Sequence, residues 1–144
     1  MIIRPATPAD LPGIRAIAEA AYRPYVARNG LEPAPLNEDY AACLPRTWVL
    51  DEDGPQGFVV LIDQPDHMLL DNVAVGPGAQ GKGYGRALMD FAEGHARAAH
   101  LPAIRLYTQE IMVENLAIYT RRGYVETHRA TEDGLPRVFM EKRL

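Results

Sequence analysis

The sequence has a single cysteine, no Cys/His cluster and no long apolar run. Cys43 has no partner for a disulfide and the four histidines are scattered, so we expect a buried, unpaired thiol and no metal site. The longest strongly apolar run, residues 58–62, is far shorter than the about 20 residues of a membrane span. Residues 1–12 contain no apolar segment typical of a signal peptide. We therefore expect a cytoplasmic protein with no membrane partner.

The sequence also lacks an excess of positive charge. It contains 15 Lys and Arg residues against 19 Asp and Glu residues, which gives a formal net charge of −4. Binding to nucleic acid depends on the neutralisation of many phosphates, so this balance argues against a nucleic-acid partner. It leaves room for a few basic residues around one anionic ligand. The length of 144 residues, 47% of them hydrophobic, predicts one domain over residues 1–144. The hydrophobic core of such a domain is large enough to be stable without a disulfide or a structural metal.

Hydrophobic periodicity predicts alternating strands and helices. The expected strands are residues 2–5, 47–50, 57–62, 69–75, 103–108, 124–130 and 137–143. The expected helices are one that starts at Thr7-Pro8 and ends before the break at 29–36, a short one capped by Asn37 that runs to Leu44, and residues 84–99 and 112–121. The order β-α-α-β-β-β-α-β-α-β-β indicates an α+β or mixed α/β fold.

Residues 76–86 (GPGAQGKGYGR) follow a Val-rich strand and open an amphipathic helix. The first turn of a helix has unpaired N–H groups and a partial positive charge, and both attract an anion. Gly81, Gly83 and Gly85 let the backbone approach a ligand closely, and Lys82 and Arg86 add positive charge. We therefore expect this segment to bind a pyrophosphate.

Three kinds of glycine loop fit parts of this segment. A nucleotide-hydrolysing P-loop needs Ser or Thr after the lysine, but Gly83 stands there. A dinucleotide fingerprint needs glycine where the sequence has Arg86 or Leu88. The third alternative is a loop that only connects a strand to a helix. The pattern that remains is Gln-x-x-Gly-x-Gly, after a strand that ends in Ala-Val.

With this pattern the sequence resembles the GNAT superfamily of acyl-CoA-dependent N-acetyltransferases. Gln80, Gly83 and Gly85 match the family's phosphate-loop motif, and the later Tyr119 and residues 120–124 (TRRGY) follow in the family's order. The resemblance covers essentially the whole chain and implies a mixed sheet of about seven strands whose central parallel strands splay apart to hold acetyl-CoA. It also implies that acetyl-CoA contacts Val73, Ala74, Val75, Gln80, Gly81, Lys82, Gly83, Tyr84, Gly85, Arg86 and Asn115.

The resemblance implies direct attack by a substrate amine on the thioester, with no enzyme nucleophile and with an N–H near Val75 polarising the carbonyl. Tyr119 occupies the position of the family's general acid, which protonates the CoA thiolate. The sequence departs from the commoner pattern at Met112, where asparagine is usual. Asn115, one turn before Tyr119, is a possible pantetheine contact or a residue that only orients its own helix.

The general base is left open between two carboxylates and an ordered water. Family members often use a carboxylate on the strand before the loop, and Asp71 is the only acid there. Strand alternation places Asp71 on the same face as Val73 and Val75. Glu110, at the end of the next strand, is the weaker candidate.

The acceptor amine is expected between the first two helices and the last hairpin. Tyr22, Arg28 and Tyr40 are the predicted substrate-binding residues, although Tyr22 also fits the core-facing stripe of its helix. Arg28 and Arg137 are possible partners for a substrate carboxylate. A small molecule, an amino acid or a peptide are all compatible acceptors, and a homodimer is a possible assembly. The alternative to an enzyme is a non-catalytic domain that binds or senses acyl-CoA.

Overall fold

A computed structural model describes all residues, 1–144, and contains one seven-stranded mixed sheet in the order β1-β2-β3-β4-β5-β7-β6. The strands are β1 (Ile2–Pro5), β2 (Thr47–Asp51), β3 (Pro55–Asp63), β4 (Met68–Val75), β5 (Ala103–Gln109), β6 (Val125–Glu132) and β7 (Leu135–Arg143). The helices are α1 (Leu11–Asn29), α2 (Tyr40–Cys43), α3 (Tyr84–Ala98) and α4 (Val113–Arg121). The predicted fold class is confirmed, because each predicted strand and helix is present in the predicted order.

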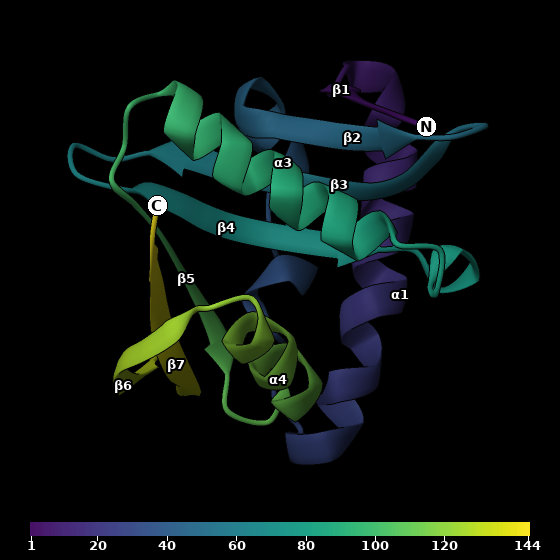
Figure 1. Cartoon of the computed structure of the whole chain (residues 1–144). Helices are drawn as coiled ribbons and strands as arrows, with labels where there is room; N and C mark the ends of the chain where they lie inside the picture. The colour runs from purple at the N-terminus through teal and green to yellow at the C-terminus, as the bar shows by residue number, and fades with distance from the viewer.

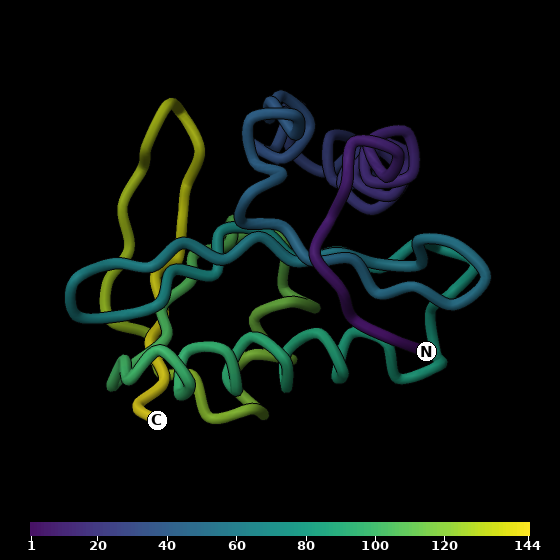
Figure 2. The backbone as a smooth tube through the Cα atoms, turned by 90° about the horizontal axis from the view of Figure 1, so that it is seen from above, coloured from purple at the N-terminus to yellow at the C-terminus, as the bar shows by residue number.

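Helices cover both faces of the sheet. Figure 1 shows α3 and α4 in front of the sheet and α1 behind it, and Figure 2 shows the same two layers from above. The larger buried cluster lies under α3 and includes Leu88 and Tyr124, whereas a smaller one joins α1 and α2 to the sheet through Ile14 and Phe58. Cys43 is buried in the smaller cluster and forms no disulfide, as predicted. None of the helices is both long and apolar enough to cross a membrane.

The parallel strands β4 and β5 separate at the middle of the sheet. Only Met68 and Leu69 of β4 pair with β5, and from there the two strands diverge. Figure 2 shows α3 on one side of the sheet and the hairpin of β6 and β7 projecting to the other side, on which α1 lies. The splay predicted from the family resemblance is therefore present, and it opens the sheet where β4 ends.

A β-bulge at Asp71 corrects the expected strand alternation. Val60 of β3 pairs with Asn72, and its neighbour Leu61 pairs with Leu70, so Asp71 has no partner on β3. The extra residue reverses which face the following side chains occupy, and both Leu70 and Val73 pack toward the cluster under α3. The expectation that Asp71 shares a face with Val73 through simple alternation is wrong for this reason.

The predicted cap of the second helix is also wrong. Asp39, not Asn37, precedes α2 and accepts a hydrogen bond from the Ala42 N–H at 3.3 Å. The Asn37 side chain donates instead to Glu32 at 3.1 Å. Both residues have the short polar side chain that suits a cap, so the sequence pattern does not distinguish them.

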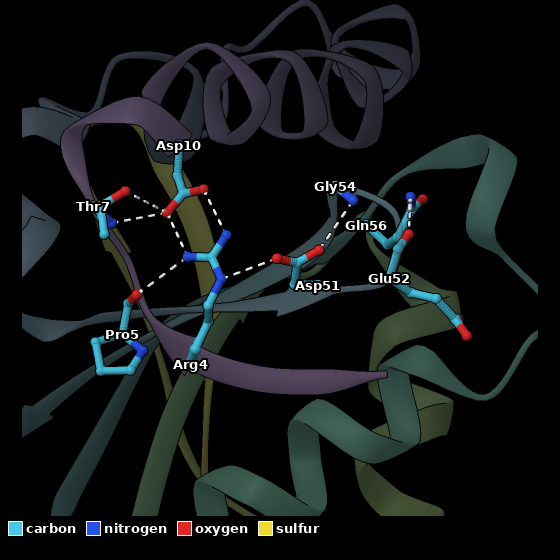
Figure 3. A network of polar contacts seen from close by, with 8 residues as sticks. All are labelled: Arg4, Pro5, Thr7, Asp10, Asp51, Glu52, Gly54 and Gln56. Carbon is cyan, nitrogen blue, oxygen red and sulfur yellow. Dashed lines mark hydrogen bonds and ion pairs between the residues drawn. The ribbon is translucent and has the colours of Figure 1, made fainter.

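An ion-pair network joins the first strand to its surroundings (Figure 3). Arg4 of β1 donates two hydrogen bonds to Asp10, at 2.8 and 2.9 Å, and one to Asp51 of β2 at 3.0 Å. Asp10 also accepts from the Thr7 N–H at 2.8 Å. The Arg4 guanidinium and these further bonds outweigh burial and lower the pKa of Asp10 to about 2. The network fixes the turn that leads from β1 into α1.

Candidate active site

The open edge of β4 presents backbone groups to the gap between the central strands. The Gly76 N–H donates to Gln56 O of β3 at 2.9 Å. Because successive residues of a strand point their backbone groups to opposite sides, the N–H groups of Val73 and Val75 point away from β3. No strand pairs with β4 on that side beyond Leu69. These two N–H groups are therefore available to a ligand that lies in the gap.

The loop after β4 ends in a row of backbone N–H groups without protein partners. Every N–H from Gln80 to Arg86 lacks a hydrogen bond to the protein, and the Ala87 N–H is the first to be paired, with Gly83 O at 3.0 Å. Gly81 and Gly83 both have φ of +81°, a left-handed conformation that side chains disfavour. A helix start with free N–H groups and a close backbone approach is a binding site for phosphate groups.

Two cavities meet at the gap between β4 and β5. The longer one, with a volume of about 720 Å³, runs from the glycine loop between α1 and α4, along Val73–Val75 of β4. The smaller one, of about 60 Å³, lies between residues 33–38, the bulge of β4 and the strands β5 and β7. Four residues line both cavities: Tyr22, Val73, Asn115 and Tyr119. A group transferred from a ligand in one cavity to a ligand in the other has to pass this junction.

Tyr119 lies at the junction with a free hydroxyl. Its side chain comes from α4 and is 9% exposed, and the hydroxyl forms no hydrogen bond with the protein. The ring packs against Tyr124 with centroids 5.9 Å apart. Burial raises the pKa of Tyr119 to about 12, so the phenol keeps its proton at neutral pH.

Asp71 lines the smaller cavity, and Glu110 does not. Burial raises the pKa of the half-buried Asp71 carboxyl, and the nearby Glu38 carboxylate raises it further against the charge of Arg46. Glu110 forms an ion pair with Arg129 at 2.7 Å, and its side chain is 43% exposed. The two carboxylates that the sequence left open are thus in different surroundings.

Tyr22 lines both cavities and belongs to a chain of hydrogen bonds. Its hydroxyl lies 2.7 Å from Asn72 Oδ1 and 2.9 Å from Val73 O, with the Tyr22 hydroxyl as donor. The Asn72 amide donates to the Tyr40 hydroxyl at 3.0 Å, and Tyr40 donates to Pro35 O at 2.6 Å. Tyr40 itself is buried behind the wall and lines neither cavity, so its predicted contact with substrate is not supported.

Arg28 spans the longer cavity instead of facing the acceptor site. Its guanidinium forms an ion pair with Glu114 of α4 at 2.8 Å and donates to Ile111 O at 3.1 Å. Tyr25 donates to the same carboxylate at 3.2 Å. These contacts tie the end of α1 to the start of α4 across the cavity. These contacts occupy the two terminal nitrogens of Arg28, and its role in substrate binding stays a prediction.

The remaining predicted cofactor contacts divide into two groups. Those that line the longer cavity are Val73, Ala74, Val75, Gln80, Gly81, Gly83, Tyr84, Gly85 and Asn115. The side chains of Lys82 and Arg86 are exposed, and Lys82 lies in a surface hollow with Glu52 and Tyr84. The Asn115 amide donates to Met112 Sδ at 3.7 Å. Met112, which stands where the commoner family pattern has asparagine, is therefore in contact with Asn115.

Four polar residues of the smaller cavity were not predicted as site residues, namely Glu38, Asn72, Tyr107 and Gln109. Asn72 was detectable as a polar residue inside a Val- and Leu-rich strand. Arg137, which was considered only as a possible carboxylate partner, also lines this cavity. Gln109 of β5 pairs directly with Arg137 of β7, and only the strand register brings these two together.

Comparisons with known proteins agree with this architecture. A sequence profile of the Acetyltransferase (GNAT) family matches residues 14–124. A sequence search among curated proteins gave no significant match. Among solved structures, a GCN5-related N-acetyltransferase from Rhodopseudomonas palustris superposes with a TM-score of 0.79 at 26% identity, covering 99% of this chain and 95% of that one.

Two further structures are similar at lower sequence identity. The PaiA N-acetyltransferase from Thermoplasma acidophilum, solved in complex with coenzyme A, has a TM-score of 0.82 at 19% identity and covers 99% of this chain and 98% of its own. A ribosomal-protein-alanine N-acetyltransferase from Brucella melitensis has a TM-score of 0.74 at 22% identity and covers 100% of both chains.

Proposed function

Because the chain belongs to the GNAT family of acetyltransferases, we propose that it transfers an acetyl group from acetyl-CoA to a primary amine of a small molecule, amino acid or peptide. One observation carries the proposal. Most residues of the loop with unpaired N–H groups, namely Gln80, Gly81, Gly83, Tyr84 and Gly85, line the same cavity as Tyr119 with its free hydroxyl. Residues 1–144 act as a single domain in this proposal.

The residues of the longer cavity fit acetyl-CoA. The N–H groups of residues 80–86 bind the pyrophosphate, and the exposed edge of β4 binds the pantetheine arm. Acetyl-CoA supplies an activated thioester carbonyl. The Val75 N–H, which points away from β3 into the gap, donates to that carbonyl oxygen as an oxyanion-hole donor does. The coenzyme A bound to the Thermoplasma acidophilum relative supports an acyl-CoA ligand for this fold.

Tyr119 serves as the general acid. The amine attacks the carbonyl directly, and the sulfur that leaves needs a proton. The Tyr119 hydroxyl is protonated at neutral pH and makes no competing hydrogen bond, so it is free to donate to the sulfur.

Asp71 serves as the general base, either directly or through a water. An amine with an ordinary pKa of about 10 is mostly protonated at pH 7 and has to lose a proton before it attacks. The raised pKa of Asp71 makes it a better proton acceptor, and Glu110 is occupied by Arg129 away from the cavity. A pH–rate profile of Asp71→Asn that keeps the acidic limb of the parent enzyme would contradict this role.

The substrate amine enters through the smaller cavity and reaches the junction beside Tyr22. The name of the Brucella melitensis relative, a ribosomal-protein-alanine N-acetyltransferase, supports an alanine of a protein as one acceptor class. The cavity volume of about 60 Å³ supports a small acceptor. The cytoplasmic location and the homodimer expected from the sequence stay predictions.

Calorimetry with acetyl-CoA, followed by a thiol-release assay against a panel of primary amines, tests the proposal. We expect binding and release of CoA thiol with at least one amine class. Gly83→Ala should raise the KM for acetyl-CoA by about tenfold, because a side chain at φ +81° costs about 1–2 kcal/mol. Gly78→Ala, in the same loop at an unstrained position with open space around it, is the matched control. Binding without thiol release on any amine would contradict the transferase and leave only an acyl-CoA-binding domain.

A further inference from the structure

Arg137 is a buried arginine whose donors have almost no protein partner. Its side chain is 10% exposed and lines the smaller cavity. It forms no hydrogen bond with the protein, and the nearest carboxylate oxygen, on the half-exposed Glu132, lies 3.9 Å away. The guanidinium carbon lies 4.5 Å from the centre of the Tyr107 ring, a contact that leaves the N–H groups unused. Buried charges without partners are costly, so this arrangement needs an explanation.

Gln109 places a second unused donor beside Arg137. It is 5% exposed, and its Nε2 is buried without any hydrogen-bond partner, while its Oε1 accepts from Asn29 at 3.3 Å. Gln109 and Arg137 are directly opposite each other on the antiparallel strands β5 and β7, so their side chains emerge on the same face. Two residues with unpaired N–H donors therefore line one small cavity.

Two carboxylates line the same cavity. They belong to Asp71 and Glu38, and the Tyr107 ring under the Arg137 guanidinium lines it as well. The cavity thus presents both negative groups and N–H donors. A ligand with a positive group and a negative group matches this distribution, whereas a plain diamine would bring a positive charge against Arg137.

We propose that the acceptor is a small molecule with a carboxylate near its reactive amine, and that Arg137 and Gln109 bind this carboxylate. This inference rests on the proposed function, because it assigns the acceptor class of that same site. Arginine suits the role since its planar guanidinium donates two parallel hydrogen bonds to a carboxylate. The carboxylate anchors the molecule on β5 and β7, and its amine then points toward Asp71 and the junction.

The experiment compares each common L-amino acid with its carboxamide as acceptor in the thiol-release assay. We expect the wild-type protein to prefer acids over the matching carboxamides. In Arg137→Met, the ratio of kcat/KM for acid over carboxamide should fall about 10- to 100-fold, the usual range for lost hydrogen bonds to a charged group. Gln109→Leu should lower the ratio less, and Arg137→Lys should restore part of it.

Arg129→Met provides the matched control, because Arg129 lies on the neighbouring strand β6 and is exposed and paired with Glu110 and Glu126. Its acid-to-carboxamide ratio should equal that of the wild type. Thermal unfolding and acetyl-CoA affinity of each variant check that the fold and the longer cavity are intact. An unchanged ratio in Arg137→Met would overturn the inference.

Absence of transferase activity can be distinguished from absence of the carboxylate site. If no acceptor releases thiol, calorimetry of the CoA-saturated protein with the same acids and carboxamides still tests the carboxylate site. Binding of acids that Arg137→Met weakens relative to carboxamides would support the inference without turnover. Equal binding of acids and carboxamides, or no binding of either, would overturn it.

Discussion

Arg4 and Arg137 are both shielded arginines at different places on the sheet, and their partners differ sharply. Arg4 donates to two carboxylates within 3.0 Å, and each of these acids belongs to a neighbouring element (Figure 3). Arg137 is more buried than Arg4, with 10% against 29% of its side chain exposed, and has no carboxylate closer than 3.9 Å. Arg4 thus holds the fold through paired donors, whereas Arg137 has unpaired donors at a cavity, where a ligand carboxylate can accept from them.

Tyr119 and Tyr124, whose rings pack against each other, show the same contrast between an unpaired and a paired polar group. The Tyr124 hydroxyl donates to Glu93 at 3.1 Å, and Glu93 also accepts from Arg122 and Lys142, so this buried network joins α3 to the end of α4 and to β7. The Tyr119 hydroxyl, on the adjacent ring, has no protein partner. One tyrosine is thus part of the scaffold, and the other presents its hydroxyl to the junction of the cavities.

The largest effect is expected from Tyr119→Phe. It should lower kcat about 100- to 10,000-fold, the range for loss of a general acid, in a thiol-release assay. Acetyl-CoA affinity and thermal stability should stay unchanged, because the hydroxyl makes no hydrogen bond in the protein. Tyr124→Phe is the reverse control: it should lose about 1 kcal/mol of stability and keep its kcat. Equal turnover in the two variants would remove the distinction between these tyrosines.

The next largest effect is expected on stability, at Arg4, whose donors are paired with two carboxylates. Asp10→Ala should lower the free energy of unfolding by about 3 kcal/mol, because it leaves the partly buried Arg4 without its main partner. Urea denaturation measures the loss, and kcat/KM of the folded fraction should be unaffected. Glu19→Ala removes an exposed ion pair with Arg23 and should cost less than about 1 kcal/mol. Equal losses in the two variants would show that the Arg4 network is no more important than a surface pair.

The features that the sequence predicts depend on local patterns, and those that it does not predict depend on how distant strands pair. Local chemistry predicted the glycine loop, because closely spaced glycines at a helix start suit an anion. The role of Tyr119 came only from the family resemblance, which places a general acid four residues before Gly123, and it stays a prediction. The pairing of Gln109 with Arg137 was not predictable, because it depends on the register of two strands far apart in the chain. The bulge at Asp71 was missed since nothing in an alternating strand pattern marks an inserted residue.

Acid should weaken the ion pair between Arg4 and Asp10 in a defined pH window. The pKa of Asp10 is lowered from 3.8 to about 2 in the folded protein, so its contribution is present above the unfolded value and is lost as the pH falls through about 2. The contribution at neutral pH is about 2 kcal/mol, since one pKa unit is worth about 1.4 kcal/mol. Urea unfolding of the wild type and Asp10→Asn between about pH 5 and pH 2 measures it. A stability difference that stays constant over this window would contradict the lowered pKa.

The smallest effect is expected at Lys82, which tests whether backbone or side chains bind the phosphates. Its ammonium is exposed and unpaired beside the loop, so Lys82→Ala should raise the KM for acetyl-CoA only about two- to fivefold. The rise should shrink at about 1 M salt, where charges are screened beyond about 3 Å. Arg143→Ala, at the opposite end of the sheet, is the control for net charge. A rise above about 100-fold would mean that the lysine, and not the row of free N–H groups, binds the pyrophosphate.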